Sequence, residues 1–153
     1  MLSNRSEMRA VIHVAAFAAF AVVLASPLEA QSDTTITVRA ASSSLEFLPS
    51  TIVVKQGRRV TLRLENVGGT LPHNFVLVKD EDDLDALAMA AMQEGGNYVP
   101  KDMKEKLLAF TTLASPGQTV EVTFVAPPAG AYTYVCLVSG HSGMMLGSLR
   151  VLP

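Results

Sequence analysis

The chain has 153 residues, of which 12 are lysine or arginine, 14 are aspartate or glutamate and one is cysteine, giving a formal net charge of −2. This length is typical of one domain, and the weak charge argues against nucleic acid or an acidic membrane surface as a partner. A single cysteine excludes a disulfide within the chain.

Residues 1–30 have the features of a secretory signal peptide. Arg5 and Arg9 precede a 15-residue run that is apolar except for one histidine, and Ala30 lies at a plausible cleavage point. The run is short for a membrane span, which takes about 20 residues. We therefore expect a mature domain over residues 31–153 in the periplasm. An uncleaved segment that tethers the domain to the membrane is the alternative.

The mature part is rich in segments with the period-two alternation of half-buried β-strands. In the segment 58–69, for example, Val60, Leu62 and Leu64 alternate with polar residues. Turn signals containing glycine or proline separate the segments. The expected strands lie within residues 34–40, 50–57, 58–69, 73–79, 119–128, 130–137 and 147–153. Seven or eight short strands at this spacing predict an all-β fold, a Greek-key sandwich or barrel.

One segment, around residues 82–94, breaks the β pattern. Its apolar residues recur at helical spacing, and the acidic residues Asp80 to Asp83 stand at its start, where a helix dipole favours negative charge. Gly95 and Gly96 follow and would end a helix. We expect an amphipathic helix packed against the outside of the sandwich, through a stripe formed by Leu84, Leu87, Ala88, Ala91 and Met92.

The lone cysteine belongs to the pattern Cys136-x4-His141-x3-Met145, within the segment YVCLVSGHSGMMLGSLRV. Exported proteins normally pair their cysteines, so an unpaired thiol indicates an intermolecular bridge, a reactive thiol or a metal ligand. Two histidines and a cysteine with a weak axial methionine form the ligand set of a blue-copper electron-transfer site. His73, which opens the predicted strand HNFVLV, is the one other histidine after residue 30.

The types of donor atom favour copper. Thiolate and thioether sulfurs suit copper, and imidazole accepts either of its oxidation states. The sequence therefore predicts one copper ion held by His73, Cys136 and His141, with Met145 as axial ligand. Met144 is an alternative axial ligand, although its spacing from His141 is less suitable. Zinc is an alternative metal for two histidines and a cysteine, but the spaced methionine would then have no purpose.

The segments PHNFVLV and YVCLVSGHSGMMLGSLRV resemble the copper-binding segments of cupredoxins, and most of all those of azurins and auracyanins. The segment EFLPSTIVVKQGRRVTLRLENVG resembles the early strands of the same family, and GGNYVPKDMKEKLLAFTTLASPGQTVEVTF resembles the stretch after the azurin flap helix. The resemblance covers nearly all of residues 31–153. It implies a cupredoxin fold, one copper ion for each chain and the same four ligands.

The resemblance also implies roles for two neighbours of His73. Asn74 matches a residue that braces the ligand loop by hydrogen bonds, and the carbonyl of Pro72 matches a position that approaches copper weakly in azurins. The chain departs from azurins in three respects: proline replaces glycine at position 72, the azurin disulfide cannot form, and LVSG replaces a more aromatic loop that contains proline. These departures favour an azurin-like or auracyanin-like relative over an orthodox azurin.

The functional expectation is an electron carrier, not an enzyme, that passes single electrons between redox partners such as cytochromes or copper reductases and oxidases. An enzyme domain would need further histidine-rich metal sites, and no histidine remains to build one. A copper-binding or copper-delivery module is the alternative function. His141 is the expected electron port, and we expect partners to dock transiently around it, on a small apolar patch formed by Leu71, Pro72, Val138, Gly143 and Met144.

Overall fold

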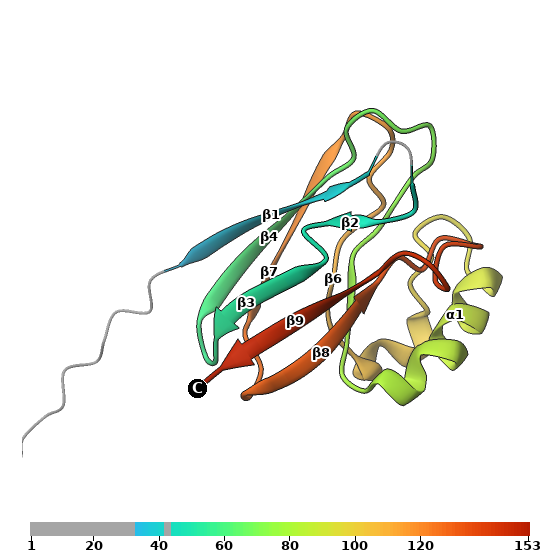
Figure 1. The fold of residues 1–153 in the computed structure, drawn as a ribbon. Helices are drawn as coiled ribbons and strands as arrows, with labels where there is room; N and C mark the ends of the chain where they lie inside the picture. The colour runs from blue at the N-terminus through green and yellow to red at the C-terminus, as the bar shows by residue number, and fades with distance from the viewer. Residues whose placement is uncertain (1–32, 42–43) are drawn as a thin grey trace, which may run out of the picture.

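The computed structural model describes residues 33–41 and 44–153, so the predicted signal peptide lies outside the described residues. Within those ranges, nine strands form two sheets that face each other as a sandwich (Figure 1). The all-β sandwich expected from the sequence is thereby confirmed. No helix in the described part of the chain is both long and apolar enough to cross a lipid bilayer.

The first sheet has the strand order β2-β1-β4-β7. Its central strand β4 is parallel to β1 and antiparallel to β7. Val60, Leu62 and Leu64 of β4 are all buried, as their alternation predicts. The strands of this sheet are β1 (Thr34–Ala40), β2 (Phe47–Leu48), β4 (Arg59–Glu65) and β7 (Thr119–Val125).

The second sheet has the strand order β3-β9-β8-β5-β6. Its strands are β3 (Thr51–Lys55), β9 (Leu146–Leu152), β8 (Gly130–Val135), β5 (Val76–Val78) and β6 (Leu107–Phe110). Strands β5 and β8 are antiparallel neighbours, with Val76 opposite Val135. This pairing places the start of β5 beside the end of β8, so residues just before β5 lie near residues just after β8.

Two strands, β2 and β6, do not follow from the sequence pattern. β2 has two residues and β6 has four, and neither is long enough to show a convincing alternation. β6 follows the 3₁₀ segment η2 (Lys101–Lys106). Six of the remaining seven strands fall within the expected segments, and β9 begins one residue before its segment. The architecture was therefore predictable although the strand count is nine.

An aromatic cluster fills the core between the sheets. Tyr134 lies edge-on to Phe47 with ring centroids 5.2 Å apart and tilted against Phe75 at 4.9 Å. All three side chains are fully buried. A Cβ atom added at Gly147, on the neighbouring strand, would lie 2.1 Å from Cζ of Tyr134. Because position 147 is glycine, the ring of Tyr134 has the space that it occupies. Tyr134 lies two residues before Cys136 in the chain.

The predicted helix is present as α1 (Leu84–Gln93), preceded by the 3₁₀ segment η1 (Glu81–Asp83). It covers the outer face of the second sheet (Figure 1). Leu87 and Ala91 of the predicted stripe are fully buried there, among the sheet residues Val76, Val78, Leu107, Val135 and Leu137. Met92 is 62% exposed, so its expected place in the buried stripe was wrong.

Candidate metal centre

His73 is fixed by backbone pairing three residues before β5. Its N–H donates to the carbonyl of Ala114 at 3.0 Å, and its carbonyl accepts from the N–H of Ala114 at 2.8 Å. This isolated bridge ties the segment that leads into β5 to the chain between β6 and β7. Both the N–H and the C=O of the His73 backbone are therefore hydrogen-bonded, which fixes the point from which the imidazole extends. His73 is 3% exposed.

Cys136 and Met145 close a short loop between β8 and β9. The N–H of Cys136 donates to the carbonyl of Met145 at 3.0 Å, and the N–H of Met145 donates to the carbonyl of His141 at 2.8 Å. The N–H of His141 donates in turn to the carbonyl of Val138 at 2.9 Å. Gly140, immediately before His141, has φ +82°, a conformation that glycine adopts without steric cost. These contacts fold the loop so that His141 turns back over Cys136.

The structure brings His73, Cys136 and His141 together. Nδ1 of His141 lies 3.4 Å from Sγ of Cys136, and Nδ1 of His73 lies 3.8 Å from the same sulfur. One donor atom from each of the three residues lies within 4.8 Å of the others. Two donors placed about 2.0–2.3 Å from one ion at roughly 120° would lie about 3.8 Å apart. The spacing therefore fits a metal ion bound by all three.

Burial sets the protonation of these groups. Burial, followed by the charge on His141, lowers the pKa of His73 to about 4, and burial also lowers the pKa of His141. Both imidazoles are thus neutral near pH 7, as ligation requires. Burial raises the pKa of the Cys136 thiol to about 11, although the backbone N–H groups of Asn74 and Val138 act in the opposite direction. A bound cation would supply the charge that favours the thiolate.

Met145 and Met144 have different surroundings. Met145 is fully buried and belongs to the same core cluster as Cys136. Met144 is 64% exposed. Of the two candidate axial ligands, Met145 is the one that packs beside the cysteine, whereas Met144 faces solvent.

Asn74 connects the two ligand-bearing segments. Its Oδ1 accepts a hydrogen bond from the N–H of Leu137 at 2.9 Å, and its Nδ2 donates to the carbonyl of Asn97 at 2.9 Å. The side chain is fully buried. The contact with Leu137 is of the kind expected from the sequence for this residue. Pro72, two residues earlier, is half-buried.

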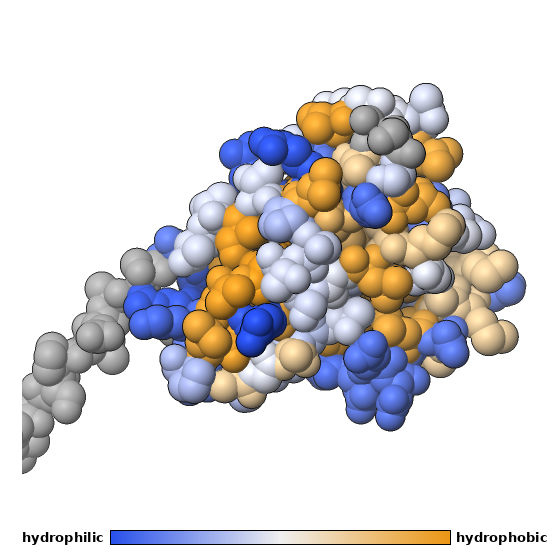
Figure 2. All heavy atoms as spheres, in the orientation of Figure 1, coloured by the Kyte–Doolittle hydropathy of each residue, from blue (hydrophilic) through white to orange (hydrophobic). Residues whose placement is uncertain are grey.

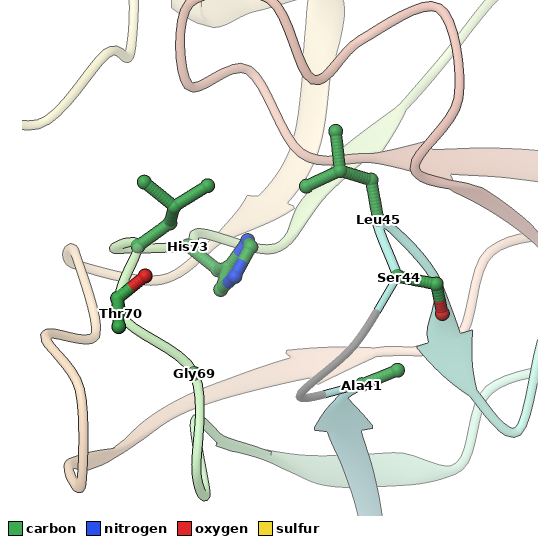
Figure 3. A pocket seen from close by; sticks show the side chains of 7 residues that line it. Ala41, Ser44, Leu45, Gly69, Thr70 and His73 are labelled. Carbon is green, nitrogen blue, oxygen red and sulfur yellow. The ribbon is translucent and has the colours of Figure 1, made fainter.

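The expected apolar patch is only partly at the surface. Leu71 and Met144 are 48% and 64% exposed, but Val138 is buried at 6%. Including Val138 in the patch was wrong, because its side chain packs in the core cluster. Next to Leu71, the ring of His73 borders an open pocket of about 200 Å³ (Figure 3). The other walls of this pocket come from Ala41, Ser44, Leu45, Gly69, Thr70 and Leu71.

Comparison with known proteins supports the same chemistry. A family model described as copper-binding proteins of the plastocyanin/azurin family matches residues 34–152. Auracyanin-A of Chloroflexus aurantiacus is 39% identical over 120 residues, covering 76% of this chain and 74% of the relative. Azurin of Achromobacter denitrificans is 31% identical over 134 residues, covering 81% of this chain and 87% of the relative.

A solved structure has the same fold. The structure of auracyanin A, described as a "blue" copper protein from a green thermophilic photosynthetic bacterium, superposes with a TM-score of 0.75 at 38% identity. The match covers 79% of this chain and 100% of that one. The sandwich fold, the buried cluster of two histidines and a cysteine, and the similarity to these relatives agree with one another. The chain belongs to the plastocyanin/azurin family of copper-binding proteins.

Proposed function

We propose that this protein is a blue-copper electron carrier in which His73, Cys136 and His141 hold one copper ion and Met145 is its axial ligand. Copper supplies one-electron redox chemistry when it is bound at such a site. The observation that carries the proposal is the convergence of two imidazole Nδ1 atoms on one buried thiol sulfur, at 3.4 and 3.8 Å.

The role of the chain is to hold these donors still and to keep water away. His73 is pinned by its bridge to Ala114, and the loop from Cys136 to Met145 is closed by its own backbone hydrogen bonds. Asn74 links the two segments through its bond to Leu137. Supporting contacts of this kind orient metal ligands and tune the metal. Donors that keep one geometry in both oxidation states suit electron transfer.

Burial favours a carrier over a copper-delivery module. His73, Cys136 and His141 are at most 5% exposed. A delivery site must release its ion to a partner, and burial of the donors hinders that release. Copper removal by a strong chelator distinguishes the two functions: a carrier loses copper over hours, and loss within seconds would support delivery.

The proposed partners are redox proteins such as cytochromes or copper reductases and oxidases, met in the periplasm. His141 is the proposed port. At 5% exposure it is the most exposed of the three buried donors, and it lies in the same loop as the exposed Met144. We define the docking patch as Leu71, Pro72, Gly143 and Met144. Apolar side chains are visible at the end of the sandwich that carries the ligand loops (Figure 2). A small patch of this kind suits transient redox encounters.

The decisive experiment is an absorption and EPR spectrum of the purified protein loaded with Cu(II). The expected result is strong visible absorption from the Cu–thiolate charge transfer, with one copper for each chain. Copper that binds without this absorption would overturn the proposal, because the thiolate would then not be a ligand. Mass spectrometry of the exported protein tests cleavage after Ala30 in the same preparation.

A further inference from the structure

Asn66 is a buried polar residue that the sequence pattern does not single out. It follows β4 directly and is 1% exposed. Its N–H donates to the carbonyl of Gln118 at 2.9 Å, and its carbonyl accepts from the N–H of Gly117 at 2.7 Å. The backbone of Asn66 is therefore fixed to the turn that precedes β7.

Its side-chain amide reaches toward the candidate copper ligand. Nδ2 donates to the carbonyls of both Leu71 and Ala114, each at 2.9 Å, so both N–H groups of the amide are used. The carbonyl of Ala114 also accepts the backbone N–H of His73 at 3.0 Å. Asn66 and His73 thus share one acceptor, and Asn66 holds a second carbonyl two residues before His73.

The loop that delivers His73 has little else to hold it. Among the described residues, the bond from Asn66 to Leu71 is the one hydrogen bond made by any residue of 67–72. Gly68 has φ +92°, and Pro72 has no N–H to donate. A loop of this composition has many accessible conformations, so one well-placed polar contact has a large influence on where the loop ends.

We infer that Asn66 is a positioning residue for His73, acting through the carbonyls of Leu71 and Ala114. The inference rests on the proposed copper site. Asn74 braces the site from the side of Leu137, whereas Asn66 fixes the entry of the chain into His73. Without the two Nδ2 bonds, His73 keeps its backbone bridge to Ala114. It loses the part of its restraint that comes from Asn66, so Nδ1 is held less firmly at its distance from Sγ of Cys136 and its donation to the metal weakens.

The test compares Asn66→Leu and Asn66→Ser with a matched control, Tyr134→Phe. Asn66→Leu keeps the number and branching of the side-chain heavy atoms and removes both donors. Asn66→Ser is smaller, and its single hydroxyl cannot donate to both carbonyls. Tyr134→Phe removes a hydrogen bond from the tyrosine hydroxyl to the carbonyl of Pro49, at 2.8 Å, without altering the ring near the site. The reduction potential, the copper hyperfine coupling in EPR and the free energy of unfolding are measured for each.

Imidazole donation stabilises Cu(II) more than Cu(I), so a loosened His73 favours Cu(I). Both Asn66 variants are expected to shift the Cu(I)/Cu(II) equilibrium at least threefold toward Cu(I), which is about 28 mV for one electron, and to change the hyperfine coupling. Tyr134→Phe is expected to lose stability with an unchanged potential. Asn66 variants that lose stability while keeping the parent potential and EPR spectrum would overturn the inference.

If neither variant folds, the parent protein decides the question. In the Cu(I) form, hydrogen exchange of the two Nδ2 protons of Asn66 should be slowed as strongly as that of the His73 backbone N–H. Exchange at the rate of an exposed amide would overturn the inference. A parent protein without the blue absorption would refute the proposed function, whereas a blue parent whose Asn66 variants behave like Tyr134→Phe would refute only the role of Asn66.

Discussion

Asn74 accepts a hydrogen bond through Oδ1 from the backbone N–H of Leu137 at 2.9 Å, although the two residues are 63 positions apart in the chain. Asn74 follows His73, and Leu137 follows Cys136. The contact therefore connects the segment that carries His73 to the segment that carries Cys136. The Asn74 side chain that makes it is fully buried.

Replacing Asn74 by alanine should weaken both the fold and the site. The change leaves the N–H of Leu137 and the carbonyl of Asn97 without their partner, and buried unpaired groups of this kind cost about 1–3 kcal/mol each. We expect the free energy of unfolding to fall by about 2–4 kcal/mol in a urea titration of the metal-free protein, and copper loss to a chelator to accelerate. Asn97→Ala is the control, since the half-buried Asn97 side chain makes only a 3.5 Å bond to Thr111. Equal effects of the two changes would contradict the bracing role.

Cys136→Ser should remove the visible colour. Serine has nearly the same shape, so the sandwich should fold, but its hydroxyl cannot take part in Cu–thiolate charge transfer. Absorption spectra of the copper-loaded protein, with circular dichroism to check folding, measure the effect. Ser142→Ala, in the same loop, is the control and should stay blue. A serine variant that keeps the colour would show that the chromophore lies elsewhere.

Met145→Leu should keep the colour and raise the reduction potential, because it removes a weak donor that stabilises Cu(II). Leucine has a similar volume, so the loss of stability should stay below about 1.5 kcal/mol. Potentiometric titration followed at the visible band gives the result. Met144→Leu changes the exposed neighbour and should leave the potential unchanged. The reverse outcome would assign the axial position to Met144.

Met144→Glu should slow electron exchange between two copies of the protein, because it places a charge in the docking patch. We expect the self-exchange rate, measured by NMR line broadening in mixtures of Cu(I) and Cu(II) protein, to fall about tenfold, with an unchanged absorption spectrum. Met89→Glu is the matched control: it adds the same charge at a residue that is 71% exposed on α1. A similar slowing by both variants would mean that net charge, and not the patch, controls the encounter.

The candidate ligands could be named from the sequence because three of them lie in one stretch. Cys136, His141 and Met145 share a short loop, and His73 was identified as the one other histidine after residue 30. Asn66 gave no such signal. Its partners Leu71 and Ala114 are brought together only by the folded backbone, and an asparagine before a glycine pair reads as an ordinary turn residue.

Exposure was the least predictable property. Val138 stands in a loop between turn residues, yet its side chain turns into the core. Met92 continues the helical stripe in sequence but is exposed, and the buried residues of α1 are Leu87 and Ala91. Periodicity identifies the side of an element that is apolar, whereas the length of its contact depends on neighbours from distant parts of the chain.

The described domain begins and ends at the same edge of the molecule. Thr34 and Leu152 line one shallow pocket, and the C-terminus lies at the end of the sandwich away from the ligand loops (Figure 1). A linker, a fused domain or an electrode surface attached at either point would therefore hold the protein by this end and leave the ligand loops free at the other.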